Sequence, residues 1–89
     1  MVDLEKLIGI KDSTVLGKKC KTLLFEAYVG TEHSRYRAFF VTENARPAAE
    51  LLEEHGLIRA QTLHKTHYLL TEKGVNLVAG NLQYFIVEK

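Results

Sequence analysis

The stretch EEHGLIRAQTLHKTHYLLTEKG, residues 53 to 74, predicts the end of one helix, two strands and the start of another helix within one short segment. Gly56 is suited to the left-handed position that follows a helix, where a side chain would be strained. Leu57 can then pack back against Leu52 in the last turn, as the Schellman motif requires. We therefore expect the preceding helix to end at about His55.

The rest of this stretch predicts a β-hairpin. Residues 57–62 and 66–70 are rich in β-branched, aromatic and leucine side chains, and Leu63, His64 and Lys65 lie between them. Thr71 is a good N-cap for the next helix, and Glu72 would sit favourably in its first turn. We therefore predict a hairpin over about 57–70 between two helices.

Helical spacing is clear on both sides of the hairpin. Before it, Asn44 as an N-cap and Pro47 in the first turn predict a helix over about 45–55. After it, apolar side chains recur at helical spacing over about 72–87, at Val75, Val78, Ala79, Leu82, Phe85 and Ile86.

The N-terminal third predicts a first long helix over about 14–29. Ser13 or Thr14 would cap it and Gly30 would end it, and residues 3–8 could form a short helical turn before it. Its apolar face is formed by Leu16, Cys20, Leu23, Leu24, Ala27 and Tyr28. Lys18, Lys19 and Lys21 lie largely off that face.

The segment TEHSRYRAFFVTE, residues 31–43, permits two readings. Thr31 or Ser34 could cap a helix over about 32–40, whereas the contiguous apolar run RAFFV is also typical of a strand. We favour the helix; the alternative, a strand over 36–41, would remove the helix-turn-helix and leave the function open.

Composition restricts the class of protein. Eighty-nine residues with 46% hydrophobic and 26% charged side chains predict one domain, 1–89, with a modest core and no deep active site. We find no secretory leader and no membrane-spanning run, so we expect a cytoplasmic protein with no membrane partner. We find no catalytic motif and expect neither an enzyme nor a cofactor.

The predicted order is a three-helix core, a hairpin and a C-terminal helix, an α+β arrangement that is mainly α. ELLEEHGLIRA followed by HYLLTEKGVNLV resembles small prokaryotic, archaeal or viral winged helix-turn-helix regulators of the MarR, PadR and HxlR kind, over roughly residues 42 to 80. The resemblance implies a recognition helix at 45–55, a wing at about 59–66, and double-stranded DNA as the partner of a transcriptional regulator.

Candidate DNA contacts follow from that arrangement. Asn44 and Arg46 would face base edges from the start of the recognition helix, and other basic side chains would hold phosphates: Arg35, Arg37, Arg59, His64, Lys65 and His67, with Lys18, Lys19 and Lys21 as further candidates. Glu50, Glu53 and Glu54 oppose this role, because a DNA groove repels acidic side chains. They lie in the C-terminal half of the helix, which need not enter the groove.

Two other patterns have simpler explanations than a functional site. His64 and His67 form an H-x-x-H spacing, but on a strand or tight turn they would point to opposite faces, so we expect no metal site. Cys20, flanked by lysines, could be a redox sensor, but its place on an apolar face favours core packing.

The C-terminal apolar side chains are too many for a small core to cover. Leu82, Tyr84, Phe85 and Ile86 are therefore predicted to form a homodimer interface, which would present two recognition helices to a palindromic site. The rival hypothesis is a winged-helix protein-interaction module that binds a protein through the acidic helix or the apolar C-terminal helix, without DNA. The DNA hypothesis requires Arg35, Arg37, Arg46 and Lys65 to share one surface.

Overall fold

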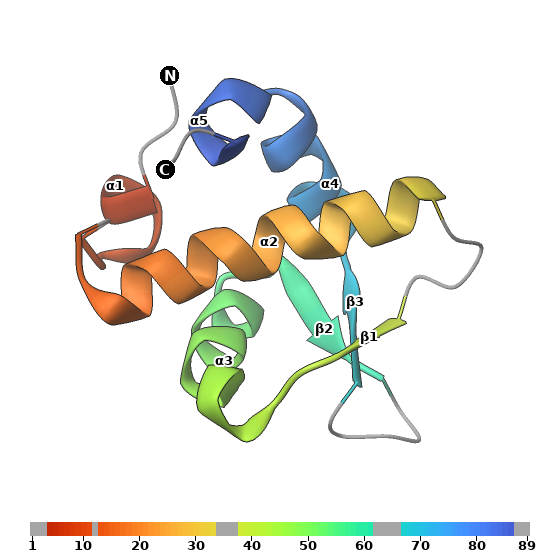
Figure 1. The fold of residues 1–89 in the computed structure, drawn as a ribbon, viewed down its shortest axis with the longest axis horizontal. Helices are drawn as coiled ribbons and strands as arrows, with labels where there is room; N and C mark the ends of the chain where they lie inside the picture. Colours follow the sequence, from red (N-terminus) through yellow and green to blue (C-terminus); the bar gives the residue numbers. More distant parts are fainter. Residues whose placement is uncertain (1–3, 12, 34–37, 62–66, 87–89) are drawn as a thin grey trace.

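The computed structural model describes residues 4–11, 13–33, 38–61 and 67–86 and contains helices around a small sheet (Figure 1). The elements in chain order are α1 (Leu4–Ile8), α2 (Val15–His33), β1 (Ala38–Phe40), the 3-10 helix η1 (Glu43–Ala45), α3 (Arg46–Glu54), β2 (Ile58–Ala60), β3 (His67–Leu70), α4 (Glu72–Ala79) and α5 (Leu82–Ile86). The protein is thus mainly helical with an antiparallel sheet, as the predicted α+β class requires.

Helix α2 is the central element of the fold. It runs across the middle of Figure 1, with α5 on one side and α3 with the sheet on the other, and it contacts α1, α3, α4, α5 and β3. The hydroxyl of Thr14 accepts a 3.0 Å hydrogen bond from the Gly17 amide, which confirms the predicted cap. Cys20 and Leu24 are fully buried, so the predicted apolar face is confirmed.

The end of α2 differs from the prediction. The helix continues past Gly30 to His33, and Gly30 is not among the glycines with a positive φ, so it does not form the left-handed C-cap that was predicted. A glycine in a helix costs about 1 kcal/mol relative to alanine, and the packing of the long buried face outweighs that cost.

The motif that ends α3 is confirmed in detail. Gly56 has a φ of 76°. The Leu57 amide donates to the carbonyl of Leu52 at 3.0 Å, and the Gly56 amide donates to that of Glu53 at 2.9 Å. Leu52 and Leu57 are both buried, so the chain leaves α3 in a fixed direction and enters β2 directly.

The sheet has the strand order β1-β3-β2, and both pairings are antiparallel. Strands β2 and β3 lie within the predicted hairpin. Thr71 caps α4 by accepting a 3.1 Å hydrogen bond from the Gly74 amide, as predicted. The segment 62–66, which contains the predicted turn, lies outside the described residues.

The predicted helix over about 32–40 is wrong at residues 38–40, which form β1. Phe39 pairs with Tyr68 of β3, and their ring centroids lie 6.3 Å apart, so tertiary pairing decides a segment that local propensity left open. In the described residues, only β1 and η1 lie between α2 and α3, and no helix-turn-helix is present there.

The predicted helix over 72–87 is divided into α4 and α5 by Gly80 and Asn81. The Asn81 side chain donates to the Leu77 carbonyl at 2.8 Å, and the Asn81 carbonyl accepts from the Tyr84 amide at 3.0 Å, so Asn81 closes one helix and opens the next. The break buries Phe85 but leaves Leu82 and Ile86 exposed.

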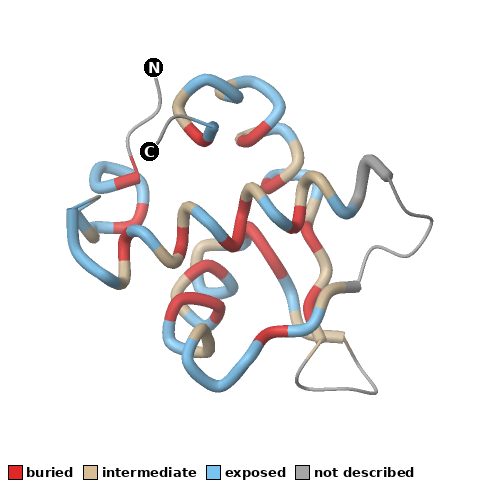
Figure 2. Tube along the Cα trace, in the orientation of Figure 1, coloured by how far each residue is buried: buried red, intermediate tan, exposed pale blue. Residues whose placement is uncertain are grey.

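The core lies between α2, α3, the sheet and the C-terminal helices, where the buried segments of Figure 2 face one another. Its largest fully buried side chains are Leu4, Leu24, Leu52, Leu57, Ile58, Val78 and Cys20. Helix α1 is joined to α5 by a 3.2 Å hydrogen bond from the Leu4 amide to the Tyr84 hydroxyl. None of the helices in the described part of the chain combines the length and apolar character that crossing a membrane requires.

Candidate nucleic-acid interface

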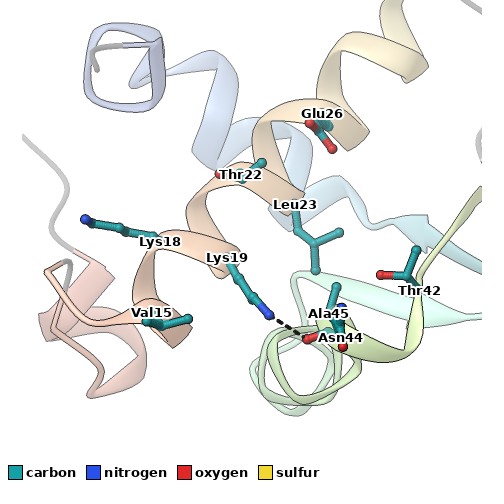
Figure 3. Close-up of a pocket in the computed structure, with 9 residues that line it drawn as sticks. All are labelled: Val15, Lys18, Lys19, Thr22, Leu23, Glu26, Thr42, Asn44 and Ala45. Carbon is teal, nitrogen blue, oxygen red and sulfur yellow. Dashed lines mark hydrogen bonds between the residues drawn. The ribbon is translucent and has the colours of Figure 1, made fainter. Parts of the chain in front are cut away.

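A groove of about 340 Å³ lies between α2 and the chain that leads into α3 (Figure 3). Its lining residues are Val15, Lys18, Lys19, Thr22, Leu23, Glu26, Thr42, Asn44 and Ala45. Six of these residues belong to α2, and the other three belong to the segment that leads into α3. We call this the α3-start groove.

A lysine of α2 holds one side of this groove. The Nζ atom of Lys19 donates a 2.9 Å hydrogen bond to the backbone carbonyl oxygen of Asn44 (Figure 3). Lys18 and Asn44 are exposed beside it. The Lys19 ammonium group therefore lies at the start of α3, and its positive charge favours a negatively charged ligand there. Glu26, on the same wall, opposes that preference.

Arg46 is the first residue of α3 and is half-buried. Burial raises the pKa of the Tyr68 phenol, the charges of Glu53 and Glu50 raise it further, and the charge of Arg46 partly opposes this rise. Arg46 therefore lies close enough to Tyr68 to affect its ionisation. Asn44 belongs to η1, and Ala45 rather than Asn44 occupies the N-cap position of α3.

Arg59 and His67 lie on the outer face of the sheet. Arg59 is exposed on β2 opposite Leu69 of β3, and His67 is paired with Phe40 of β1. The rings of Phe40 and His67 meet edge to face with centroids 5.5 Å apart, and Phe40 is 60% exposed. This face therefore offers a cation and an aromatic side chain to solvent.

Four of the predicted DNA contacts, Arg35, Arg37, His64 and Lys65, lie outside the described residues. The requirement that Arg35, Arg37, Arg46 and Lys65 share one surface therefore stays a prediction. What the structure does bring into contact is Asn44 with Lys19, whereas Lys18 lines the same groove with its side chain extending away from Asn44 (Figure 3). Lys21 is separate, because its Nζ atom lies 4.1 Å from the ring centroid of Tyr84 in α5.

Thr22 and Thr42 were not predicted as site residues. Thr22 lies four residues after Lys18 and on the same side of the helix, so its place beside Lys18 could have been predicted from the helical period. The position of Thr42 could not be predicted, because it depends on β1 and the sequence permitted either a helix or a strand there.

Cys20 belongs to the core. It is fully buried, its thiol lies 3.9 Å from the Ala48 carbonyl oxygen, and burial raises its pKa from 9.0 to about 11. Both properties oppose thiolate formation and access by oxidants. Among the residues that the structure describes, no three histidine, cysteine, aspartate or glutamate side chains gather as metal ligands would.

Comparison with known proteins gives no relative. No family model, no curated protein sequence and no solved structure matches this chain.

Proposed function

We propose that the protein binds double-stranded DNA and that the α3-start groove holds backbone phosphate. The observation that supports this most directly is the hydrogen bond between Lys19 and Asn44, because it joins the basic side of α2 to the start of α3. Lysines contact phosphates as point charges, so the ammonium groups of α2 would supply the phosphate contacts. The groove is open to solvent and lies on an exposed part of the molecule.

The proposed contact differs from a helix-turn-helix. The exposed side chains Glu50, Glu53 and Glu54 would be repelled by a DNA groove, so α3 would approach with its first turn only. Asn44 and Arg46 are then the side chains nearest to base edges. Arg59 and His67 would add contacts from the sheet to a neighbouring part of the backbone.

A regulator of transcription that reads a palindromic site would be a homodimer. The surface that we assign to the dimer contains Leu82 and Ile86 of α5, which are 37% and 59% exposed. Phe85 was predicted to lie at this interface, but its side chain is only 6% exposed and belongs to the core. We therefore leave Phe85 out of the proposed dimer surface. Tyr84 is half-buried and bonded to α1, so it would contribute its edge at most.

Fluorescence anisotropy of a labelled duplex from the promoter of the protein's own gene tests this proposal. We expect Lys18→Gln with Lys19→Gln to weaken binding about tenfold or more at low salt, because two phosphate contacts are lost. Lys6→Gln with Lys11→Gln is the matched control, since it removes the same charge from exposed positions outside the groove. An equal loss of affinity in both variants would show that binding depends on net charge and not on this groove. Absence of binding to any duplex would overturn the proposal.

A further inference from the structure

A second groove, of about 580 Å³, lies between α3 and the chain around the start of α2. It is lined by Ile10, Leu16, Pro47, Glu50, Leu51, Glu53 and Glu54 and shares no residue with the α3-start groove. We call it the acidic groove. It would be available while the α3-start groove is occupied, because the two have separate walls.

The floor of the acidic groove is apolar. Ile10 and Leu16 come from the start of α2 and the chain before it, and Pro47 and Leu51 lie one turn apart on α3. All four are partly exposed, although three of them, Ile10, Leu16 and Leu51, also pack against the buried core. A partner that covers these apolar side chains removes them from water, and this burial stabilises the complex.

The rim of the acidic groove is negatively charged. Glu50, Glu53 and Glu54 are exposed along one face of α3, and none of the described residues that line the groove is basic. Glu53 has an internal role, since its Oε2 atom accepts a 3.2 Å hydrogen bond from the Ala60 amide. Glu50 and Glu54 are four residues apart and therefore one above the other on the helix. They can receive two cationic side chains spaced by one helical turn.

We propose that the acidic groove binds a basic amphipathic helix of a partner protein. The nine residues of α3 extend over about 13.5 Å, which matches about two and a half turns of a helix laid beside it. Such a partner would place apolar side chains on Pro47 and Leu51 and place lysine or arginine beside Glu50 and Glu54. The charge of the rim excludes DNA from this surface and selects a cationic peptide.

The probe for this proposal is a fluorescein-labelled synthetic peptide of about 14 residues, long enough for about four helical turns, with leucines on one face and lysines beside them. Its binding is measured by anisotropy, and methyl NMR spectra locate the contact. We expect shift changes at Ile10, Leu16 and Leu51. Two control peptides have the same leucines with glutamate in place of lysine, and the same composition in an order without an apolar face.

Charge-removing variants make the test specific. Glu50→Gln with Glu54→Gln should weaken peptide binding about tenfold, since two exposed ion pairs with the peptide are lost. Glu5→Gln with Glu72→Gln removes the same charge outside the groove and should change the affinity less than about twofold. Equal effects of the two variant pairs, binding of the glutamate or reordered peptide, or shift changes confined to other methyls would each overturn the proposal. So would self-association of the protein that moves the same methyls without peptide.

Discussion

The side chain of Lys19 and the backbone carbonyl of Asn44 are joined by a 2.9 Å hydrogen bond across the α3-start groove. Lys19 follows Lys18 on α2, next to the fully buried Cys20, so its backbone is held by the core while its ammonium group reaches the start of α3. This position makes Lys19 the best single test of the groove.

Lys19→Gln should reduce the salt dependence of DNA binding. Each phosphate contact contributes about 0.9 to the slope of log K against log salt concentration, so the slope should become shallower by about that amount. The measurement is a titration of the same duplex between about 50 and 200 mM salt. A slope that changes equally in Lys6→Gln would show that Lys19 makes no local contact with phosphate.

Gly74→Ala should destabilise the fold by about 2 kcal/mol, although alanine is usually preferred to glycine in a helix. A Cβ atom at this position would overlap the Leu57 carbonyl oxygen and lie 2.8 Å from the Leu70 Cδ1 atom. Gly30→Ala in α2 is the control, because a Cβ atom there meets no neighbour within 4 Å. It should stabilise the protein by about 0.5–1 kcal/mol. Urea denaturation of both variants measures the difference, and a stabilised Gly74→Ala would contradict the close packing of α4 on the hairpin.

Thr71→Ala should cost about 1–2 kcal/mol of unfolding free energy. The Thr71 hydroxyl accepts from the Gly74 amide and lies 2.6 Å from the Gly56 carbonyl oxygen and 3.0 Å from that of Leu57. It therefore links the start of α4 to the end of α3. Thr71→Ser keeps the hydroxyl and should retain most of the stability in thermal denaturation. If serine proved as harmful as alanine, the methyl group rather than the cap would be responsible.

The segment from α3 to α4 could be predicted from the sequence because its signals are local. Gly56, Leu57 and Thr71 act on residues within a few positions of themselves, and the structure confirms all three. The strand at Phe39 could not be predicted in the same way. It forms because β3, about thirty residues later, offers a partner at Tyr68, and a single sequence does not reveal that pairing.

The candidate site was predicted only in part for the same reason. Asn44 was identified from its position at the start of α3, but its neighbour Lys19 comes from a helix 25 residues earlier in the chain. The helical period placed Lys19 on the exposed side of α2 without showing what that side faces. The break at Gly80 and Asn81 could have been found, because glycine weakens a helical pattern and asparagine favours turns.

Cys20 should react slowly with thiol reagents in the folded protein. Burial raises its pKa from 9.0 to about 11, so at pH 8 its thiolate fraction is about 100-fold lower than that of an unfolded chain, before access is considered. Because the folded pKa is the higher one, this group's contribution to stability is fully present below about pH 9 and is lost as pH rises toward 11. Modification rates and urea midpoints at pH 8 and pH 10 measure both effects. Rapid modification at pH 8 without unfolding would contradict the buried position.

Leu82→Glu with Ile86→Glu should convert a dimer to a monomer without unfolding it. The two side chains lie one turn apart on α5 and are 37% and 59% exposed, so charge there stays hydrated in the monomer but would be buried unpaired in the interface. Sedimentation velocity measures the mass of both proteins, and circular dichroism confirms that the variant is folded. Phe40→Glu is the control, because it places charge on another exposed apolar side chain, on the sheet. If the wild-type protein sediments as a monomer at all concentrations, α5 is not a dimer interface. DNA would then have to be bound by a single chain.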